Sequence, residues 1–558
     1  MFERRIRHIQ RYREIASAFS RNGFGFLVEE LGLQDILSLP KRLLKKNHEV
    51  HAKTTGERVR LFLEQLGPTF VKLGQIASTR PDVIPADMIQ EISKLQDRVS
   101  PFPTDEVKTI IEQELGFEID ELFSEFHEEP LGAASIGQVH YAVLKTGEQV
   151  AVKVQRPGVE KMIHTDLEIL EELAALAEHR LRWAEKYQVK AIVEEFSKAI
   201  LAELDYTIEA KNAAKIARQF ENNQKIRIPS VYKEFSTKKV LTTEYFEGTK
   251  ISEHEELRNK GYHLGRVANQ ITHAIFHQVL IEGFFHGDPH PGNILVLEEE
   301  VIVFIDFGMV GRLTYDMKIQ LANLVIAMMR QSSDGVIKAI NQMGLVPEDV
   351  NMRLLRLDIE ELKEKYYDVP LSEVHLGEAV NDLMEIAHEH RIRIPADLSL
   401  LGKTFLTLEG MVEKLDPDFS IMKAAEPFGR QLIKERLHPK RMAERMITHV
   451  GEYGEIILEF PKQMKEITAL LKKEKIPLEI SIPKVELFLT KLDRISNRLS
   501  FSIVLLSFSI IMVGLIIGSS LRGQTSVLWN IPAVEIGFGV ALLMFLWLLY
   551  SIFKSGRF

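Results

Sequence analysis

The spacing of apolar residues divides the chain into long helical stretches and short stretches with a strand pattern. Over residues 1–50, apolar positions recur every three to four residues among arginines and lysines. This predicts basic helices that either lie on an anionic membrane or dock on the protein itself. A helical period continues through residues 58–99, whereas residues 139–144 and 149–154 are short apolar runs around a Thr-Gly turn, the signature of a β-hairpin.

Beyond this hairpin the pattern predicts helices again, interrupted by a second hairpin. Residues 159–222 have a helical period that is broken near residue 187. Residues 294–297 and 301–304 are short apolar strands joined by three glutamates. Residues 311–430 are again helical in pattern, and charged helices with proline breaks follow. The expected fold class is therefore α+β, with a helical extension before the mixed domain.

Two nearly uncharged apolar runs lie near the C-terminal end, at residues 500–521 and 536–553, and each is long enough to cross a bilayer. Buried globular helices are the alternative, but two adjacent runs favour a transmembrane hairpin. Basic residues flank the pair on its outer sides: Lys491, Arg494, Arg498, Lys554 and Arg557. The positive-inside rule then predicts a multi-pass protein of the cell membrane, with both termini and the soluble part in the cytoplasm.

Composition excludes several function classes. The chain has 558 residues, too many for one hydrophobic core. A formal charge of −9 and the lack of an aromatic-interleaved basic stretch argue against nucleic-acid binding. No cysteine is present, so disulfides, thiolate metal sites and cysteine nucleophiles are excluded. The eighteen histidines have no tight ligand spacing, and the arginine-rich N-terminus has no apolar core of a signal peptide.

The chemistry concentrates at residues 286–308. Asp288 and Asn293 are five residues apart, the interval between the catalytic aspartate and the metal-binding asparagine of a protein-kinase catalytic loop. Pairing of the second hairpin would bring Asn293 and Asp306 together, where two oxygen ligands can hold Mg²⁺ across the phosphates of ATP. Asp288 would then face the incoming nucleophile. A simple turn at the Asp-Phe-Gly of residues 306–308 is the alternative.

The first hairpin carries the candidate phosphate-binding residues. Lys153 follows Val150-Ala151-Val152, like the phosphate-pairing lysine on the third strand of a kinase, and Glu209 is its candidate ion-pair partner. An edge-strand lysine is the alternative. The expected glycine-rich loop is replaced by small residues: Gly132, Ala133, Ala134 and Ser135. Free backbone amides there can still approach phosphates, although alanines make the loop stiffer and can alter nucleotide choice.

Two further segments complete the candidate site. Backbone groups from Glu244 to Phe246 are expected to contact an adenine ring, with Thr243 at the gatekeeper position. After Gly308 the pattern soon becomes helical, without the activation segment that protein kinases use to bind peptides. This absence argues against ordinary protein phosphorylation.

A third group of residues is expected to sit at the edge of this site. Lys72 and Gln75 share one helical face. On a continuous helix Glu203 and Glu209 would point about 120° apart, so that one helix addresses two partners. Glu203 and Asp205 would then face Lys72 and Gln75, unless they form a solvated acidic surface.

Five motifs in this order resemble the UbiB family, the aarF-domain atypical protein-kinase-like proteins of isoprenoid quinone biosynthesis. They begin at Lys72, Gly132, Glu203, His286 and Asp306. The resemblance implies a protein-kinase-like bilobal fold with a helical N-terminal extension and a C-terminal two-helix transmembrane hairpin. It also implies that the Lys72 segment folds over the site, and that the Gly132 loop is normally richer in alanine. The implied domains are residues 1–50, 51–126, 127–248, 249–430, 431–498 and 499–558.

The resemblance implies a membrane-anchored kinase or ATPase that uses Mg-ATP and supports ubiquinone or menaquinone biosynthesis. Its acceptors are expected to be lipid-like rather than peptides. Its expected partners are membrane lipids, quinone intermediates and other quinone-biosynthesis enzymes. Two alternatives stay open: a protein kinase that acts on a cytoplasmic partner, and a nucleotide-gated scaffold without turnover.

Overall fold

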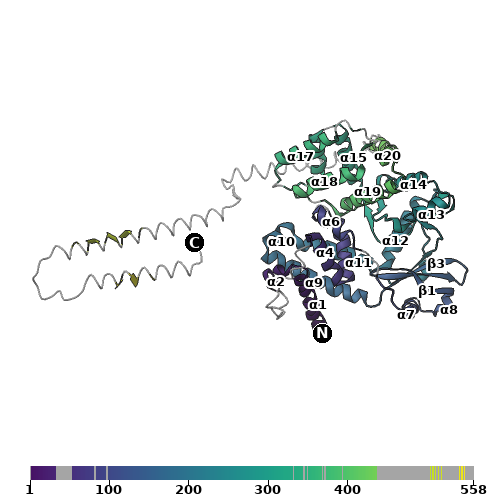
Figure 1. Cartoon of the computed structure of the whole chain (residues 1–558), viewed down its shortest axis with the longest axis horizontal. Helices are drawn as coiled ribbons and strands as arrows, with labels where there is room; N and C mark the ends of the chain where they lie inside the picture. Colours follow the sequence, from purple (N-terminus) through teal and green to yellow (C-terminus); the bar gives the residue numbers. More distant parts are fainter. Residues whose placement is uncertain are drawn as a thin grey trace, which may run out of the picture. The chain divides into compact units, whose positions relative to one another are not determined.

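The computed structural model describes residues 2–32, 53–80, 83–95 and 99–436, with short gaps between 331 and 393, and isolated positions between 503 and 546. Its contacts divide the chain into two compact units, Met1–Arg445 and Met446–Phe558. The elements that carry the candidate site lie in the first unit, coloured from purple to green in Figure 1.

Helices of 6 to 20 residues form the N-terminal extension. They are α1 (Phe2–Arg21), α2 (Gly25–Glu30), α4 (Thr55–Leu66), α5 (Pro68–Ala77), α6 (Ala86–Ile92) and α7 (Thr104–Leu115). Helix α4 begins at a capping box, in which Thr54 and Glu57 each satisfy the other's backbone amide. Phe62 and Phe70 are buried in one cluster with Ile169 of helix α9 (Val159–Arg180). The extension therefore shares a hydrophobic core with the domain that follows it.

Helix α1 is docked on the protein. The Arg11 guanidinium lies 2.6 Å from the Asp166 carboxylate of α9 and donates to the Leu66 carbonyl at the end of α4. On the same helix Ile15 and Ala16 are buried. Of the two interpretations of the basic N-terminus, α1 agrees with docking on the protein itself. The second basic group, at residues 41–46, lies outside the described residues.

A four-stranded antiparallel sheet follows, in the order β1-β2-β3-β5. Its strands are β1 (Phe123–Ala133), β2 (Gly137–Leu144), β3 (Gln149–Gln155) and β5 (Val240–Glu244), and the short helix α8 (Ile119–Leu122) precedes β1. The first predicted hairpin is confirmed, with His140 opposite Val152. Strand β1 was not predicted, because polar residues and Pro130 interrupt its alternation.

Helices fill the long insertion between β3 and β5. They are α9, α10 (Arg182–Tyr187), α11 (Val189–Glu203) and α12 (Tyr206–Gln219). The predicted break near residue 187 is confirmed, since Gln188 has a φ of 50° between α10 and α11. The prediction of one continuous helix through Glu203 and Glu209 is wrong. Asp205 begins a new helix because its side chain accepts from the Thr207 amide at 3.0 Å, as an N-cap does.

The second lobe is mainly helical and encloses small sheets. Its strands are β4 (Ile226–Arg227), β6 (Thr249–Lys250), β7 (Phe284–His286), β8 (Ile294–Val296), β9 (Ile302–Phe304) and β10 (Val310–Arg312). Its α-helices are α13 (His254–Asn259), α14 (Leu264–Phe276), α15 (Tyr315–Met329), α16 (Ser333–Gln342), α17 (Met352–Lys365), α18 (Leu376–Glu389), α19 (Ala396–Leu415) and α20 (Ile421–Arg436). The predicted second hairpin is confirmed as β8 and β9, whose register pairs Ile294 with Phe304.

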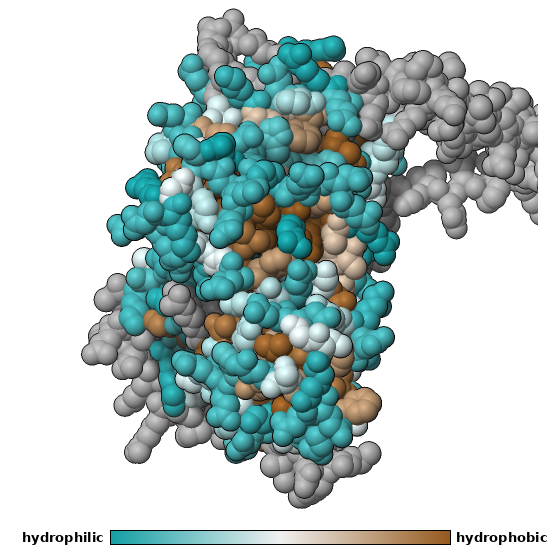
Figure 2. Space-filling view, turned by 90° about the vertical axis from the view of Figure 1, so that its right-hand side faces the viewer, coloured by the Kyte–Doolittle hydropathy of each residue, from teal (hydrophilic) through white to brown (hydrophobic). Residues whose placement is uncertain are grey.

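The hydrophobic core of this lobe joins the hairpin to its helices. Phe276 of α14, Phe304 of β9 and Phe405 of α19 belong to one buried cluster. Helix α19 therefore packs in the same core as the strands that carry the candidate catalytic loop. On the side of the unit that carries β3 and α13, hydrophobic residues gather in the middle of the surface within a hydrophilic surround (Figure 2).

The two predicted membrane spans, at residues 500–521 and 536–553, lie outside the described part of the chain except for isolated positions. Among the residues that the structure describes, no helix is both long and apolar enough to cross a bilayer.

Candidate active site

One large cavity brings together residues from every segment of the predicted site. Its volume is about 1600 Å³. Fourteen of the fifteen predicted site residues line it: Lys72, Gln75, Gly132, Ala133, Ala134, Lys153, Glu203, Asp205, Glu209, Glu244, Phe246, Asp288, Asn293 and Asp306. The exception is Ser135, whose side chain is buried and does not line the cavity. Segments far apart in the sequence thus meet around one space.

Lys153 reaches the cavity because of the alternation of strand β3. Val152 and Val154 on either side of it are fully buried against Val107 and Ile111 of the N-terminal extension, so Lys153 points to the opposite face. Because both neighbouring valines face the core, Lys153 lies on the face of the sheet that lines the cavity.

The predicted ion pair between Lys153 and Glu209 is present. The Lys153 ammonium lies 2.8 and 3.0 Å from the two Glu209 carboxylate oxygens and 3.6 Å from Asp306. Burial would lower the pKa of Lys153, but Asp306 and Glu209 together raise this pKa well above its ordinary value. Lys153 is thus a fixed positive charge in the wall of the cavity.

Asp306 is held as an anion beside this lysine. Burial favours its neutral form, but the Lys153 charge and the Gly308 amide, which donates to Asp306 at 2.9 Å, lower its pKa to about 2. The side chain is 43% exposed, on the cavity side. Asp306 therefore offers an ionised carboxylate to a cation or to a nucleotide-bound metal.

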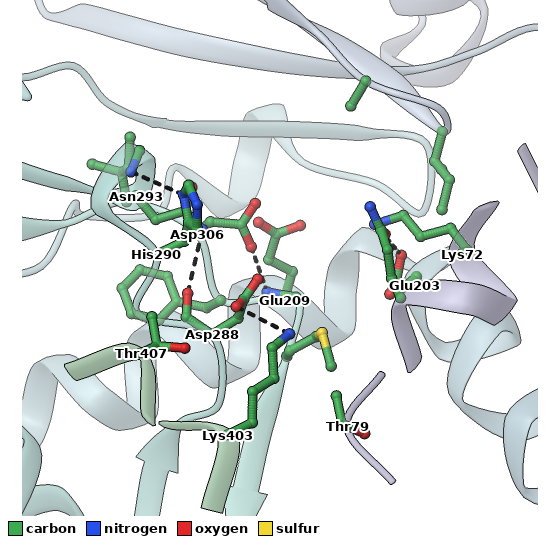
Figure 3. Close-up of a pocket in the computed structure, with 18 of the residues that line it drawn as sticks. Lys72, Thr79, Glu203, Glu209, Asp288, His290, Asn293, Asp306, Lys403 and Thr407 are labelled. Carbon is green, nitrogen blue, oxygen red and sulfur yellow. Dashed lines mark hydrogen bonds and ion pairs between the residues drawn. The ribbon is translucent and has the colours of Figure 1, made fainter. Parts of the chain in front are cut away.

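The catalytic loop is shaped by hydrogen bonds of its own residues. Burial lowers the pKa of His286, and its imidazole Nδ1 accepts from the Asp288 amide at 3.1 Å. The Asp288 carbonyl accepts from the His290 amide at 2.7 Å and from Asn293 Nδ2 at 3.4 Å. These bonds curl the loop so that the Asp288 carboxylate is left facing the cavity (Figure 3).

The hairpin positions the candidate metal ligands. The Ile305 amide donates to the Asn293 carbonyl at 3.1 Å, which places Asn293 next to the residue that precedes Asp306. The prediction that strand pairing brings these two residues to one end is confirmed. Asn293 directs its Nδ2 at the loop, so Oδ1 is the atom that can bind a cation. An amide oxygen and an ionised carboxylate are a donor set that suits Mg²⁺.

The small-residue loop between β1 and β2 differs from its prediction. The Ala134 amide donates to the Gly137 carbonyl at 2.7 Å, so it closes the turn and is not free for a phosphate. Gly132 and Ala133 pair with Val139 and Gln138 as part of the sheet. The loop therefore meets the cavity mainly through small side chains and the outer edge of its backbone.

The segment after β5 also has fewer free amides than predicted. The Glu244 amide donates to the Ser230 carbonyl at 2.8 Å, and the Tyr245 amide donates to Gln149 at 3.0 Å. The Phe246 ring lies 5.0 Å from the Arg227 guanidinium. Backbone recognition of a base in this segment would therefore depend on carbonyl groups and on Phe246.

Of the four residues expected at the edge of the site, two form a direct contact. The Lys72 ammonium of α5 lies 3.1 Å from the Glu203 carboxylate at the end of α11. Gln75 instead donates to the Leu95 carbonyl at 3.5 Å, and Asp205 caps α12. Figure 3 shows the Lys72–Glu203 pair to one side, away from Asp288. The N-terminal extension thus forms part of the cavity wall, and the Lys72–Glu203 ion pair joins it to α11 there.

Sequence reasoning missed Lys403 of α19. Its ammonium lies 3.2 Å from the Asp288 carboxylate and points at it in Figure 3. A lysine in a long helix carries no motif, and the regular period of α19 gives no sign that one of its faces reaches the catalytic loop. Tertiary packing alone brings these two residues together.

Comparison with known proteins agrees with this geometry. Residues 94–340 match the ABC1 atypical kinase-like domain. A probable protein kinase UbiB of Marinobacter nauticus is 36% identical over 73% of this chain and 75% of its own length. An uncharacterized protein from the hydrogenase 1 5′ region of Clostridium pasteurianum is 32% identical over 98% of this chain and 99% of its own. The chain belongs to the ABC1/UbiB family of atypical kinase-like proteins.

Two further matches and one plant relative extend this family assignment. Residues 359–420 match the UbiB helical domain, and residues 483–554 match the ABC1/UbiB kinase-like C-terminal domain. The chloroplastic protein ACTIVITY OF BC1 COMPLEX KINASE 7 of Arabidopsis thaliana is 37% identical over 68% of this chain and 55% of its own. Lys403 lies in the helical domain, outside the kinase-like match that contains Asp288.

Proposed function

We propose that the protein binds Mg-ATP and transfers the γ-phosphoryl group to a lipid-like hydroxyl compound or to water, in support of isoprenoid quinone biosynthesis. The observation that carries the proposal is the convergence of Lys153, Asp288, Asn293 and Asp306 on one cavity, in the order and spacing of a kinase. The quinone role rests on the family resemblance. Relatives named probable protein kinase UbiB support the choice of phosphoryl transfer.

The reaction assigns a task to each residue. Lys153, fixed by Glu209, orients the phosphates of ATP. The acceptor oxygen forms a bond to the γ-phosphorus while the bond to the β–γ bridging oxygen breaks, and ADP leaves. The proton of the acceptor hydroxyl passes to the Asp288 carboxylate. Asn293 and Asp306 would hold Mg²⁺, which neutralises phosphate charge when bound.

Two features of the cavity support a small, partly apolar acceptor over a peptide. Strand β10 leads to α15 within a few residues, which leaves no platform for an extended peptide. The cavity volume of about 1600 Å³ exceeds the roughly 300–1,000 Å³ usual for one small ligand. Leu131, Ile208 and Leu406 line it with apolar side chains that are at least 36% exposed. A nucleotide and an amphipathic acceptor would therefore fit side by side.

The proposed location is the cell membrane. The apolar runs at residues 500–521 and 536–553 would form a hairpin, with the catalytic part and both termini in the cytoplasm. In this arrangement the cavity would receive membrane lipids or quinone intermediates. The Lys72–Glu203 pair would keep the N-terminal extension closed over the cavity and exclude large substrates.

The test is release or transfer of phosphate by the full-length protein with Mg-ATP, with and without anionic liposomes and a quinone-headgroup phenol. We expect turnover that rises with liposomes or the phenol and falls at least 10²-fold in Asp288→Asn. ATP binding without turnover above the Asp288→Asn background would refute the enzymatic proposal and favour a nucleotide-gated scaffold. Phosphorylation of an added protein, lost in Asp288→Asn, would favour a protein kinase instead.

A further inference from the structure

The Asp288 carboxylate has a cationic partner that comes from outside the kinase-like core. Lys403 Nζ lies 3.2 Å from Asp288 Oδ1, and both side chains line the cavity. Lys403 is 26% exposed and Asp288 is 32% exposed, so a ligand can reach both. The pair therefore stands at the place where an acceptor hydroxyl and a γ-phosphate would meet.

Helix α19 holds Lys403 against the catalytic loop through the residues next to it. The Thr404 hydroxyl lies within hydrogen-bond distance of the His286 and Gly287 carbonyls, at 3.4 and 3.2 Å. A Cβ atom added to Gly287 would lie 2.5 Å from Leu400 Cδ2, so loop and helix touch at this point. This contact fixes the backbone of Lys403 beside Asp288, whereas the flexible four-carbon side chain of a lysine allows its ammonium to move.

No other cation is available in the loop. The sequence from Asp288 to Asn293 contains no lysine or arginine. His290 uses its Nδ1 to accept from the Gly292 amide at 3.2 Å, which shapes the turn. Three other lysines that line the cavity, Lys153, Lys72 and Lys94, have the carboxylates of Glu209, Glu203 and Glu91 as partners, and Lys250 lies on β6. Among the described residues, Lys403 is the lysine that forms an ion pair with Asp288.

We propose that Lys403 is a catalytic residue that binds the transferred phosphoryl group. With Mg-ATP bound, the ammonium moves from Asp288 to the oxygens of the γ-phosphoryl group, where negative charge is greatest. This frees Asp288 to take the proton of the acceptor hydroxyl and stabilises the phosphoryl group as the bond to ADP breaks. The inference rests on the proposed function, because it requires Mg-ATP in this cavity.

The test compares the affinities of Lys403→Met and wild type for Mg-ADP and for ADP with aluminium fluoride, which mimics the phosphoryl group in transfer. We expect Mg-ADP affinity to change less than twofold and affinity for the aluminium-fluoride complex to fall on the order of 10²-fold. Lys403→Arg, which keeps the charge, should recover part of this loss. The matched control is Lys414→Met, which replaces an exposed lysine in the last turn of the same helix. We expect this variant to bind Mg-ADP and the aluminium-fluoride complex as tightly as wild type does.

The outcomes separate this inference from the proposed function. Equal affinity of Lys403→Met and wild type for the aluminium-fluoride complex, or equal losses for both ligands, would overturn the role of Lys403. If wild type binds both ligands but shows no turnover, the enzymatic proposal is contradicted. The difference between the affinities of Lys403→Met for the two ligands would still show whether Lys403 binds the phosphoryl group. Wild type that binds neither ligand would overturn both. A thermal melt accompanies each variant, and Lys403→Gln replaces Lys403→Met if the latter does not fold.

Discussion

Two ion pairs in the same cavity differ in how tightly the protein holds them. Lys153 and Glu209 make two contacts of 2.8 and 3.0 Å, and Glu209 is only 9% exposed. Lys403 and Asp288 make a single contact of 3.2 Å, and Asp288 is 32% exposed. The two lysines are equally exposed, at 25% and 26%, so the pairs differ in their carboxylates and in the number of contacts. The first pair belongs to the packed half of the site and the second to its open half.

The two ion pairs are therefore suited to different roles. A buried pair with two hydrogen bonds cannot exchange partners without a large loss of free energy, so it suits a fixed role such as the orientation of phosphates. An open pair loses little when a ligand replaces one partner. The site therefore combines a rigid nucleotide-binding half from the kinase-like core with an exchangeable pair that the helical domain completes.

The strongest way to test this contrast is to remove one carboxylate from each pair. Glu209→Gln should lower the free energy of unfolding by about 2–3 kcal/mol, because it leaves the Lys153 ammonium partly buried with Asp306 as its remaining partner. Asp288→Asn should change it by less than about 1 kcal/mol. Urea denaturation of the two variants measures both values. Similar losses in both would show that the two halves are equally rigid.

Packing within the fixed half can be tested at two glycines of the β1–β2 region. A Cβ at Gly137 would lie 2.4 Å from the Tyr206 hydroxyl and 2.5 Å from the Val154 carbonyl, whereas a Cβ at Gly132 would meet nothing within 4 Å. Gly137→Ala should therefore cost about 2 kcal/mol of stability. Gly132→Ala, the matched control, should cost less than about 0.5 kcal/mol. Thermal melting distinguishes them, and equal melting temperatures would contradict the packing described here.

The smallest expected effect is the pH dependence that Asp306 contributes. Its pKa in the folded protein is about 2, below the ordinary 3.8, so the ionised side chain stabilises the fold above about pH 4. This stabilisation is lost as the pH falls from about 4 to about 2. Because solvent screens a side chain that is 43% exposed, Asp306 contributes about 1 kcal/mol to the free energy of unfolding. Asp306→Asn should reduce the slope of stability against pH in this window, measured by urea denaturation at each pH. An unchanged slope would contradict the assignment.

Much of the packed half could be predicted from sequence because local rules decide it. The pairing of one short hairpin is enough to bring Asn293 next to Asp306. Alternation around Lys153 determines which face of the sheet it occupies. These are contacts between neighbours in sequence or in register, and they follow from strand geometry.

The errors have identifiable physical causes. Glu203 and Glu209 were assigned to one helix because the helical period continues through both, but the Asp205 N-cap starts a new helix. The small-residue pattern predicts a free Ala134 amide, yet this amide closes the turn by donating to the Gly137 carbonyl. Lys403 could not be found, because only tertiary packing brings α19 to the catalytic loop.

The most direct test of the central claim is calorimetric titration of Mg-ATP into wild type, Lys153→Met and Asp288→Asn. We predict that Lys153→Met loses affinity at least tenfold, because the fixed cation that orients the phosphates is gone. Asp288→Asn should bind at least as tightly as wild type, since a negative charge near the γ-phosphate is removed and Lys403 is released. Equal affinities in all three proteins, or a larger loss in Asp288→Asn than in Lys153→Met, would contradict the division of the site into a fixed and an exchangeable half.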